Sequence, residues 1–300
     1  MKASFENFMT GLIDYAGMFP PAALDIETAQ RNYTDYLEGG DSWMLGRYII
    51  PATQLHRAFV RPDFRFSVIV SPEMPKEELD QLSIFKGCVE MVETRVPEDN
   101  DSPARCSDHL LRLKTGLAQT GLQGVQLFVE AENVTAVASA IATFNNSNIE
   151  GEVVKNAGFK FRCGGLKKQP YPSPEKVTEA ISTCCDHDIP IKFTAGMHHP
   201  LGNNSPEIRP LQHGFINIFG AALLYWTGNL SKSEITECLC DKAASHFHFT
   251  KEHFSWREKT ISAGEIERLR LSKVISFGSC SFTEPVEGLS SLGFASNSGV

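Results

Sequence analysis

Two stretches of the chain decide the fold: GFKFRCGG at residues 158–165 and PIKFTAGMHHP at residues 190–200. In both, a lysine alternates with large apolar residues. One face of each extended segment is therefore apolar, and the other carries Lys160 with Arg162, or Lys192 with Thr194. A strand normally keeps charge away from a core. Pointing two ammonium groups inward has an electrostatic cost, and function is the usual reason for it.

Six further short apolar runs make eight expected strands, at residues 13–17, 45–51, 66–70, 89–96, 125–130, 159–164, 191–196 and 274–281. Helical patterns lie between most of them, and such alternation predicts parallel pairing with right-handed crossovers. Eight such units in 300 residues predict an α/β fold, a single (β/α)8 TIM-type barrel. An open doubly wound sheet is the alternative, because the helix between the second and third strands looks short.

The longest gap between strands separates the seventh from the eighth. It holds two extra helical patterns, near 233–247 and 263–271, so we expect an elaborated segment at this point of the barrel. The sequence contains no obvious linker or repeat. We therefore expect one barrel domain, residues 1–293, followed by a flexible tail, residues 294–300.

Composition narrows the class of protein. The net charge of −8, from 28 basic and 36 acidic residues, argues against a nucleic-acid partner. No run approaches the roughly 18 apolar residues of a membrane span, and the first residues lack a signal-peptide pattern. The eight cysteines contain no Cys-x-x-Cys pair. These features predict a cytoplasmic protein with a small-molecule partner and no membrane partner, and they are compatible with a homo-oligomer.

The paired lysines suggest amine chemistry. A lysine that forms a Schiff base must be a free amine near neutral pH, whereas lysine titrates near 10.4 in water. A second cation nearby lowers that pKa and makes the amine nucleophilic. We expect Lys160 to be that nucleophile and Lys192 to lower its pKa. Glu130, at the end of the fifth expected strand, is the third candidate catalytic residue.

The two lysine strands, 32 residues apart from Lys160 to Lys192, resemble strands six and seven of deoxyribose-phosphate aldolase-type class I aldolases. The resemblance implies a Schiff base at Lys160, a tuning role for Lys192, and aldolase or lyase activity without a cofactor. The chain departs from the aldolase pattern at Arg162, Cys163 and Gly164, and it offers no clear acid–base aspartate on an early strand. Residues 16–22 and 277–282, with the lysine strands, also resemble a bacterial barrel family of unassigned function.

An anion site is the second expectation. Glycines and serines at strand ends let backbone N–H groups approach an anion, and basic side chains supply charge. We therefore expect a small anionic carbonyl substrate. The candidate binding residues are Arg47, Arg162, Thr194, Gly164, Gly165, Gly278, Ser279 and Ser281.

Three other interpretations remain open. In the first, His198, His199 and His213 with Glu130 hold a divalent metal ion in a lyase or hydrolase. The phrase from His213 to Asn217 resembles the metal-binding region of HMG-CoA lyase-type barrels. In the second, Cys163 or Cys280 is a thiolate nucleophile, although no Cys/His spacing supports it. In the third, the lysines pair with Glu130 or Glu93 in a structural network, and the protein is a non-catalytic ligand-binding barrel.

Overall fold

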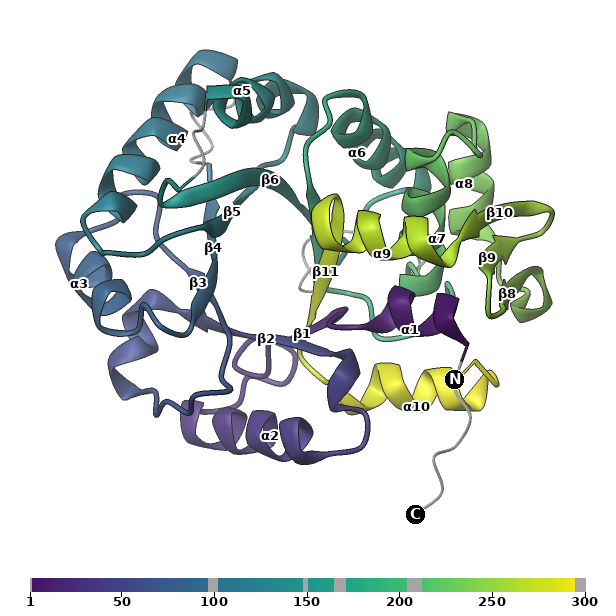
Figure 1. Cartoon of the computed structure of the whole chain (residues 1–300), viewed down its shortest axis with the longest axis horizontal. Helices are drawn as coiled ribbons and strands as arrows, with labels where there is room; N and C mark the ends of the chain where they lie inside the picture. The colour runs from purple at the N-terminus through teal and green to yellow at the C-terminus, as the bar shows by residue number, and fades with distance from the viewer. Residues whose placement is uncertain (1, 97–101, 148–150, 165–170, 204–211, 295–300) are drawn as a thin grey trace.

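The computed structural model of the chain describes residues 2–96, 102–147, 151–164, 171–203 and 212–294. Eight parallel strands close into a barrel in the order β1-β11-β7-β6-β5-β4-β3-β2 (Figure 1). They are β1 (Ile13–Tyr15), β2 (Leu45–Pro51), β3 (Phe66–Ile69), β4 (Val89–Arg95), β5 (Val125–Glu130), β6 (Val154–Arg162), β7 (Ile191–Thr194) and β11 (Val274–Ser279). The predicted (β/α)8 barrel is confirmed. The open-sheet alternative is wrong, because β1 pairs with both β2 and β11 and leaves the ring no edge.

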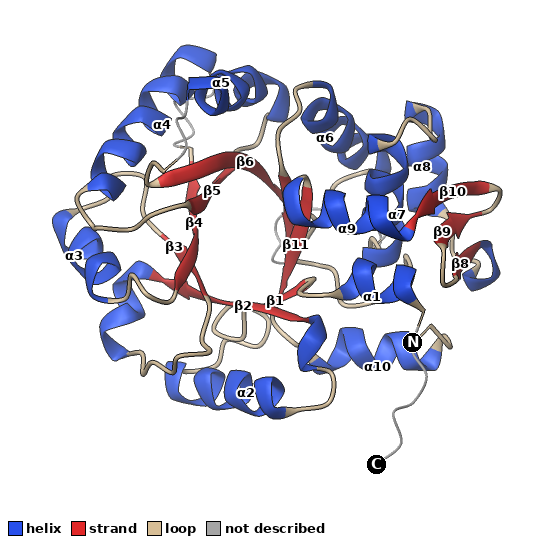
Figure 2. Cartoon of the chain, viewed as in Figure 1, coloured by secondary structure: helices blue, strands red, loops and turns tan. Residues whose placement is uncertain are grey.

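Helices surround the ring of strands (Figure 2). They are α1 (Ala3–Met9), α2 (Ile26–Glu38), α3 (Lys76–Ile84), α4 (Pro103–Ala118), α5 (Val134–Ser147), α6 (Pro174–Asp186), α7 (Phe215–Trp226), α8 (Lys232–Cys240), α9 (Ala263–Ser272) and α10 (Thr283–Ser291). Asp25, Ser102 and Ser173 start α2, α4 and α6, since each side chain accepts a backbone N–H three residues later. Short 3-10 helices span Ser42–Met44, Ala52–Arg57 and Ala244–His246. The Ala52–Arg57 turn follows β2, where the sequence had predicted a short connection.

The segment between β7 and β11 is elaborated, as expected, but its secondary structure differs from the two predicted helices. The predicted helix at 233–247 ends at Cys240, and a three-stranded antiparallel sheet follows: β8 (Phe247–Phe249), β9 (His253–Trp256) and β10 (Lys259–Ser262). The ring of Phe8, on α1, packs against Phe249 and Phe254 of this sheet. Phe294, assigned to the tail, also packs against Phe249, at 5.8 Å between ring centroids. The rest of the predicted tail lies outside the described residues.

The barrel interior holds a small apolar group of its own. Met91, Phe128 and Ile275 pack together, apart from the main core between strands and helices. Met91 lies directly against the charged layer, because its sulfur is 3.3 Å from Lys192 Nζ. Ile275 also faces a pocket at the opposite, amino-terminal end of the strands. The apolar group therefore lies between the lysine layer and part of that pocket, and Arg47, which also lines the pocket, reaches Asp14 with its Nη1 at 3.7 Å.

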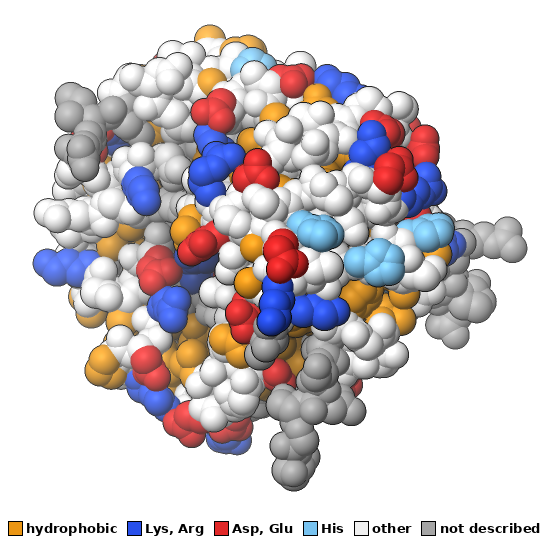
Figure 3. Space-filling view, turned by 45° about the vertical axis from the view of Figure 1, so that its right-hand side comes forward, with side chains coloured by type: hydrophobic (Ala, Val, Ile, Leu, Met, Phe, Trp, Pro, Cys, Tyr) orange, Lys and Arg blue, Asp and Glu red, His pale blue; other side chains and the backbone are white. Residues whose placement is uncertain are grey.

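The distribution of charge on the molecular surface agrees with the mixed charges of the sequence. Figure 3 shows acidic and basic side chains interspersed over one face, without a continuous basic area on that face. Among the described helices, none combines the length and apolar character needed to cross a bilayer.

Candidate functional site

Lys192 lies at the closed end of a network of charges inside the barrel. Its Nζ is 2.6 Å from Asp14 Oδ2 and 2.6 Å from Glu93 Oε1, and all three side chains are fully buried. Ser276 donates to the same Asp14 oxygen at 2.6 Å, and Ser67 donates to Glu93 Oε1 at 2.5 Å. The ammonium and both carboxylates are thus neutralised and hydrogen-bonded, which is how buried charge is tolerated.

Lys160 continues the network toward the carboxyl ends of the strands. Its Nζ lies 2.8 Å from Glu93 Oε2 and 3.0 Å from Glu130 Oε2. Glu130 in turn accepts from Arg162 Nε at 3.1 Å. Register explains the arrangement, since Glu130, Lys160 and Lys192 are consecutive partners across β5, β6 and β7. The expectation of one shared interior layer for both lysines follows from that register.

The pKa of Lys160 shifts in the direction opposite to the one expected from the sequence. Burial alone would lower the pKa of Lys160, but the Glu93 and Glu130 carboxylates outweigh it and raise that pKa above its ordinary value. Burial would likewise raise the pKa of both carboxyls, yet their cationic neighbours hold the pKa of Glu93 and of Glu130 below the usual range. The idea that Lys192 lowers the pKa of Lys160 by repulsion is therefore corrected. Glu93 bridges the two ammonium groups and screens one from the other.

Exposure increases along the network in one direction. The Lys192 side chain is 0% exposed, Lys160 is 7%, Glu130 is 13% and Arg162 is 46%. A molecule entering at the carboxyl ends would therefore meet Arg162 and Glu130 first and Lys160 next. Barrel enzymes carry out their chemistry at this end.

Two further predicted binding residues join this end. Thr194 is paired in register with Arg162 on one side and Gly278 on the other. A Cβ placed on Gly278 would lie 3.1 Å from Thr194 Oγ1 and 2.9 Å from Ile49 Cδ1, so a glycine keeps the space beside Thr194 open. Arg162, Thr194 and Gly278 are thus neighbours around the barrel.

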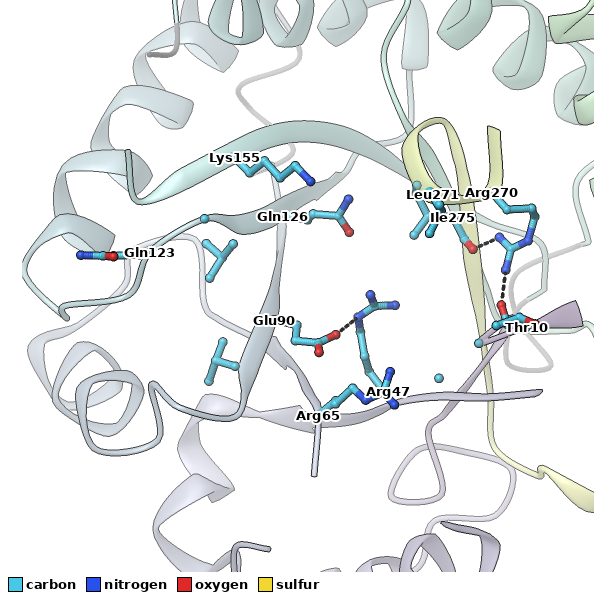
Figure 4. A pocket seen from close by; sticks show the side chains of 15 residues that line it. Thr10, Arg47, Arg65, Glu90, Gln123, Gln126, Lys155, Arg270, Leu271 and Ile275 are labelled. Atoms are coloured by element: carbon cyan, nitrogen blue, oxygen red, sulfur yellow. Dashed lines mark hydrogen bonds and ion pairs between the residues drawn. The ribbon is translucent and has the colours of Figure 1, made fainter. Parts of the chain in front are cut away.

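Arg47 lies elsewhere. It is near the start of β2 and lines a pocket of about 460 Å³ at the amino-terminal ends of the strands, with Glu90, Gln126 and Lys155 (Figure 4). Its Nε is 3.1 Å from Glu90 Oε2, and its backbone N–H donates to Asp14 Oδ1 at 2.8 Å. The expected role of Arg47 beside Arg162 is corrected, because its guanidinium occupies the opposite end of the barrel.

The remaining glycines and serines among the predicted binding residues stabilise loops at the strand ends. Gly164 packs against Gly196, so that a Cβ on Gly164 would lie 2.6 Å from the Gly196 Cα. The Ser279 hydroxyl accepts from the Ser281 N–H at 3.4 Å, and the Ser281 hydroxyl accepts from the Glu284 N–H at 3.2 Å. Both serines thus shape the turn into α10. Gly165 lies outside the described residues.

The histidines of the metal interpretation do not converge. His213 is buried and its Nε2 lies 2.7 Å from the Pro172 carbonyl oxygen, whereas His198 Nδ1 lies 2.7 Å from Glu284 Oε2. His199 is exposed. In the described parts of the chain, no group of three or more His, Cys, Asp or Glu side chains has the geometry to hold a metal ion.

Asn217, the last residue of the phrase that resembles HMG-CoA lyases, has a structural environment. Its amide donates to the carbonyls of Cys238 and Asp241, both at 2.7 Å, and its oxygen accepts from the Gly202 N–H at 2.9 Å. These bonds tie α7 to the end of α8 and to the loop after β7.

Asp14 and Glu93 were not among the candidate site residues, although the non-catalytic alternative pairs the lysines with Glu130 or Glu93. Asp14 stands between Ile13 and Tyr15, which is the pattern that singled out the lysines, whereas Glu93 stands between Val92 and Thr94. Asp14 lies on the first strand of the barrel. Its role becomes visible only when β1 closes against β11 and brings it to Lys192.

Comparison with known proteins does not assign the chain to a family. No protein-family model matches the chain, and a search of curated proteins found no match.

Proposed function

We propose that the protein is a lyase of the aldolase type that acts on a small anionic carbonyl compound. The observation that carries the proposal is the position of Lys160 Nζ, held 2.8 Å from Glu93 and 3.0 Å from Glu130 at the accessible end of the network. An amine between two carboxylates has a proton acceptor within hydrogen-bond reach. That arrangement is what an amine nucleophile needs when its own pKa is high.

Substrate binding would release the proton. Arg162 is 46% exposed and forms an ion pair with Glu130, so an incoming carboxylate or phosphate can take the Arg162 guanidinium from Glu130. Without that neighbour the pKa of Glu130 rises, and the carboxylate accepts a proton from the Lys160 ammonium. The neutral amine then attacks the substrate carbonyl carbon, and loss of water gives an iminium ion.

The iminium supports carbon–carbon cleavage. Glu130, deprotonated again as water leaves, removes a proton from the substrate β-hydroxyl. The carbon–carbon bond breaks, and its electron pair moves into the iminium to form an enamine. Protonation of the enamine and hydrolysis then return Lys160. Glu93, held by Lys192 and Ser67, stays anionic beside the cationic nitrogen and stabilises it.

Borohydride trapping tests the proposal. The protein is incubated with pyruvate or with a phosphorylated aldehyde, reduced, and weighed intact, and the modified peptide is mapped. We expect one adduct on Lys160 in the wild type and none in Lys160→Arg, which keeps the positive charge. Lys155→Arg is the matched control, because Lys155 lies on the same strand but is exposed at the other end. An adduct that survives Lys160→Arg would contradict the proposal.

A non-catalytic ligand-binding barrel is the second candidate. The observation that favours it is the complete ion pairing of both lysines and the raised pKa of Lys160. It predicts saturable binding of a small anion that depends on Arg162, with no reduced adduct for any carbonyl compound tested. The same trapping experiment therefore separates the two candidates.

A further inference from the structure

Three side chains outside the lysine network meet where β7 and β11 end. His198 follows β7, Cys280 follows β11, and Glu284 lies in the first turn of α10. His198 Nδ1 is 2.7 Å from Glu284 Oε2, and His198 Nε2 is 4.0 Å from Cys280 Sγ. One ring nitrogen thus faces a carboxylate and the other faces a thiol. This is the order of nucleophile, base and orienting acid that activates cysteine nucleophiles.

The backbone before His198 is shaped to make this contact. Ala195 and Gly196 both have positive φ, 61° and 73°, which is unusual for alanine. The Ala195 N–H donates to the Gly278 carbonyl at 3.3 Å and joins this turn to β11. Such strain persists where surrounding structure enforces it, and it is often found at functional sites.

The environment of Cys280 sets it apart from most cysteines of the chain. Cys106, Cys163, Cys184 and Cys238 are buried, and burial raises the pKa of the Cys163 thiol well above its usual value. Cys280 and His198 are both partly exposed, so a reagent or substrate can reach them.

The charges around His198 favour its protonated form. The hydrogen bond to Cys280 and the Glu284 carboxylate raise the pKa of His198, against the effect of burial. Tyr15 also lies near Cys280, and burial raises the pKa of its phenol to about 12, so it is neutral there. The carboxylate that faces the imidazole is that of Glu284.

We propose that Cys280 is the nucleophile of a second reaction centre that accepts acyl groups from small esters or thioesters. The Cys280 thiol proton moves to His198 Nε2, and Glu284 stabilises the imidazolium. The thiolate sulfur attacks the acyl carbon, and the carbonyl electron pair moves to oxygen. Collapse of this intermediate expels the alcohol or thiol, which takes its proton from His198. Water then attacks the resulting thioester, so that the carboxylic acid leaves and the Cys280 thiol is restored.

This centre is independent of the lysine proposal. It shares no residue with the network of Lys160, and its chemistry needs no amine. Its test uses an ester and no borohydride, so failure of one proposal leaves the other intact.

The probe is p-nitrophenyl acetate, followed by intact mass and peptide mapping. In wild-type protein we expect an acetyl group on Cys280, formed at least tenfold faster than on Cys240, an exposed cysteine that serves as internal control. This competition needs no variant and so does not depend on a variant folding. Equal labelling of the two cysteines would overturn the proposal.

Variants identify the roles of the partners. His198→Gln should slow acetylation of Cys280 at least tenfold, whereas His199→Gln, the exposed neighbour, should leave it unchanged. Circular dichroism checks that both variants are folded. Equal rates in two folded variants would refute the role of His198.

Glu284 acts through His198 and is a positioning residue. Because its charge raises the pKa of His198, and the imidazole must be neutral to take the thiol proton, Glu284→Gln should move the pH of half-maximal labelling downward. A lower labelling rate with an unchanged pH profile would instead assign Glu284 a merely structural role and would contradict the triad.

Discussion

Lys192 Nζ lies 2.6 Å from Asp14 Oδ2, although 178 residues separate the two in the sequence. Both side chains are fully buried, so neither can exchange its partner for water. The pair fixes the first strand of the barrel to the seventh across β11, which lies between them in the ring. The Lys192 side chain is 0% exposed and that of Lys160 is 7% exposed, so Lys160 is the more accessible of the two lysines.

Removal of the Lys192 charge should destabilise the fold strongly. In Lys192→Met, Asp14 and Glu93 lose the ammonium that lies 2.6 Å from each. Breaking a buried pair by deleting one partner costs about 3–5 kcal/mol. Urea unfolding measures the loss. Lys76→Met, which breaks an exposed pair with Asp80, is the control and should change the midpoint very little. Similar midpoints for both variants would contradict a buried network.

Acid should weaken the fold through Glu93. Its cationic neighbours hold its pKa well below the value of about 4.3 expected in the unfolded chain. As the pH falls from about 5 toward 3, the unfolded chain binds a proton that folded Glu93 does not, so the free energy of unfolding decreases. Urea midpoints across this range should fall less steeply in Glu93→Gln than in the wild type. Exposed Glu287→Gln should retain the wild-type slope.

The parts of the site that could be predicted are those that depend on local pattern. Lys160 and Lys192 stand out because each alternates with apolar residues within one strand, and strand register then makes them neighbours. Asp14 also stands between apolar residues, and Glu93 follows a valine, but a carboxylate in a strand has many available partners. Only closure of the ring decides which lysine each one meets.

Other features depend on contacts between distant loops. Cys280 and His198 are 82 residues apart and meet only through the turn at Ala195. The inserted sheet was missed because its strands have only three or four residues, too few to show alternation. The bounds of β2 were predicted correctly, at 45–51, but Arg47 is the third residue of that strand and was grouped with residues at the carboxyl ends.

Arg162 should control affinity for the substrate anion. Its guanidinium is the accessible cation beside Glu130, so Arg162→Gln removes a charged hydrogen bond to the substrate anion. Such bonds contribute about 1.5–3 kcal/mol, which corresponds to a loss of about tenfold or more in affinity. The carbonyl concentration that gives half-maximal borohydride trapping should rise accordingly.

The control for Arg162 is Arg65→Gln. Arg65 is an exposed arginine of the pocket at the other end of the barrel, and its loss should leave trapping unchanged. An equal shift in both variants would indicate a general charge effect and would remove Arg162 from the proposed site.

Substitutions of Asn217 distinguish a structural role of this residue from a role as a metal ligand. Its amide nitrogen lies 2.7 Å from two carbonyl oxygens, so Asn217→Ala leaves these groups and the Gly202 N–H without their partner, at a cost of about 1–3 kcal/mol. In Asn217→Asp, a carboxylate oxygen would replace the nitrogen and repel both carbonyls. We therefore expect Asn217→Asp to lower the thermal midpoint at least as much as Asn217→Ala. A metal ligand would behave in the opposite way, because aspartate preserves an oxygen donor. Recovery of wild-type stability in Asn217→Asp on addition of a divalent ion would restore the metal interpretation.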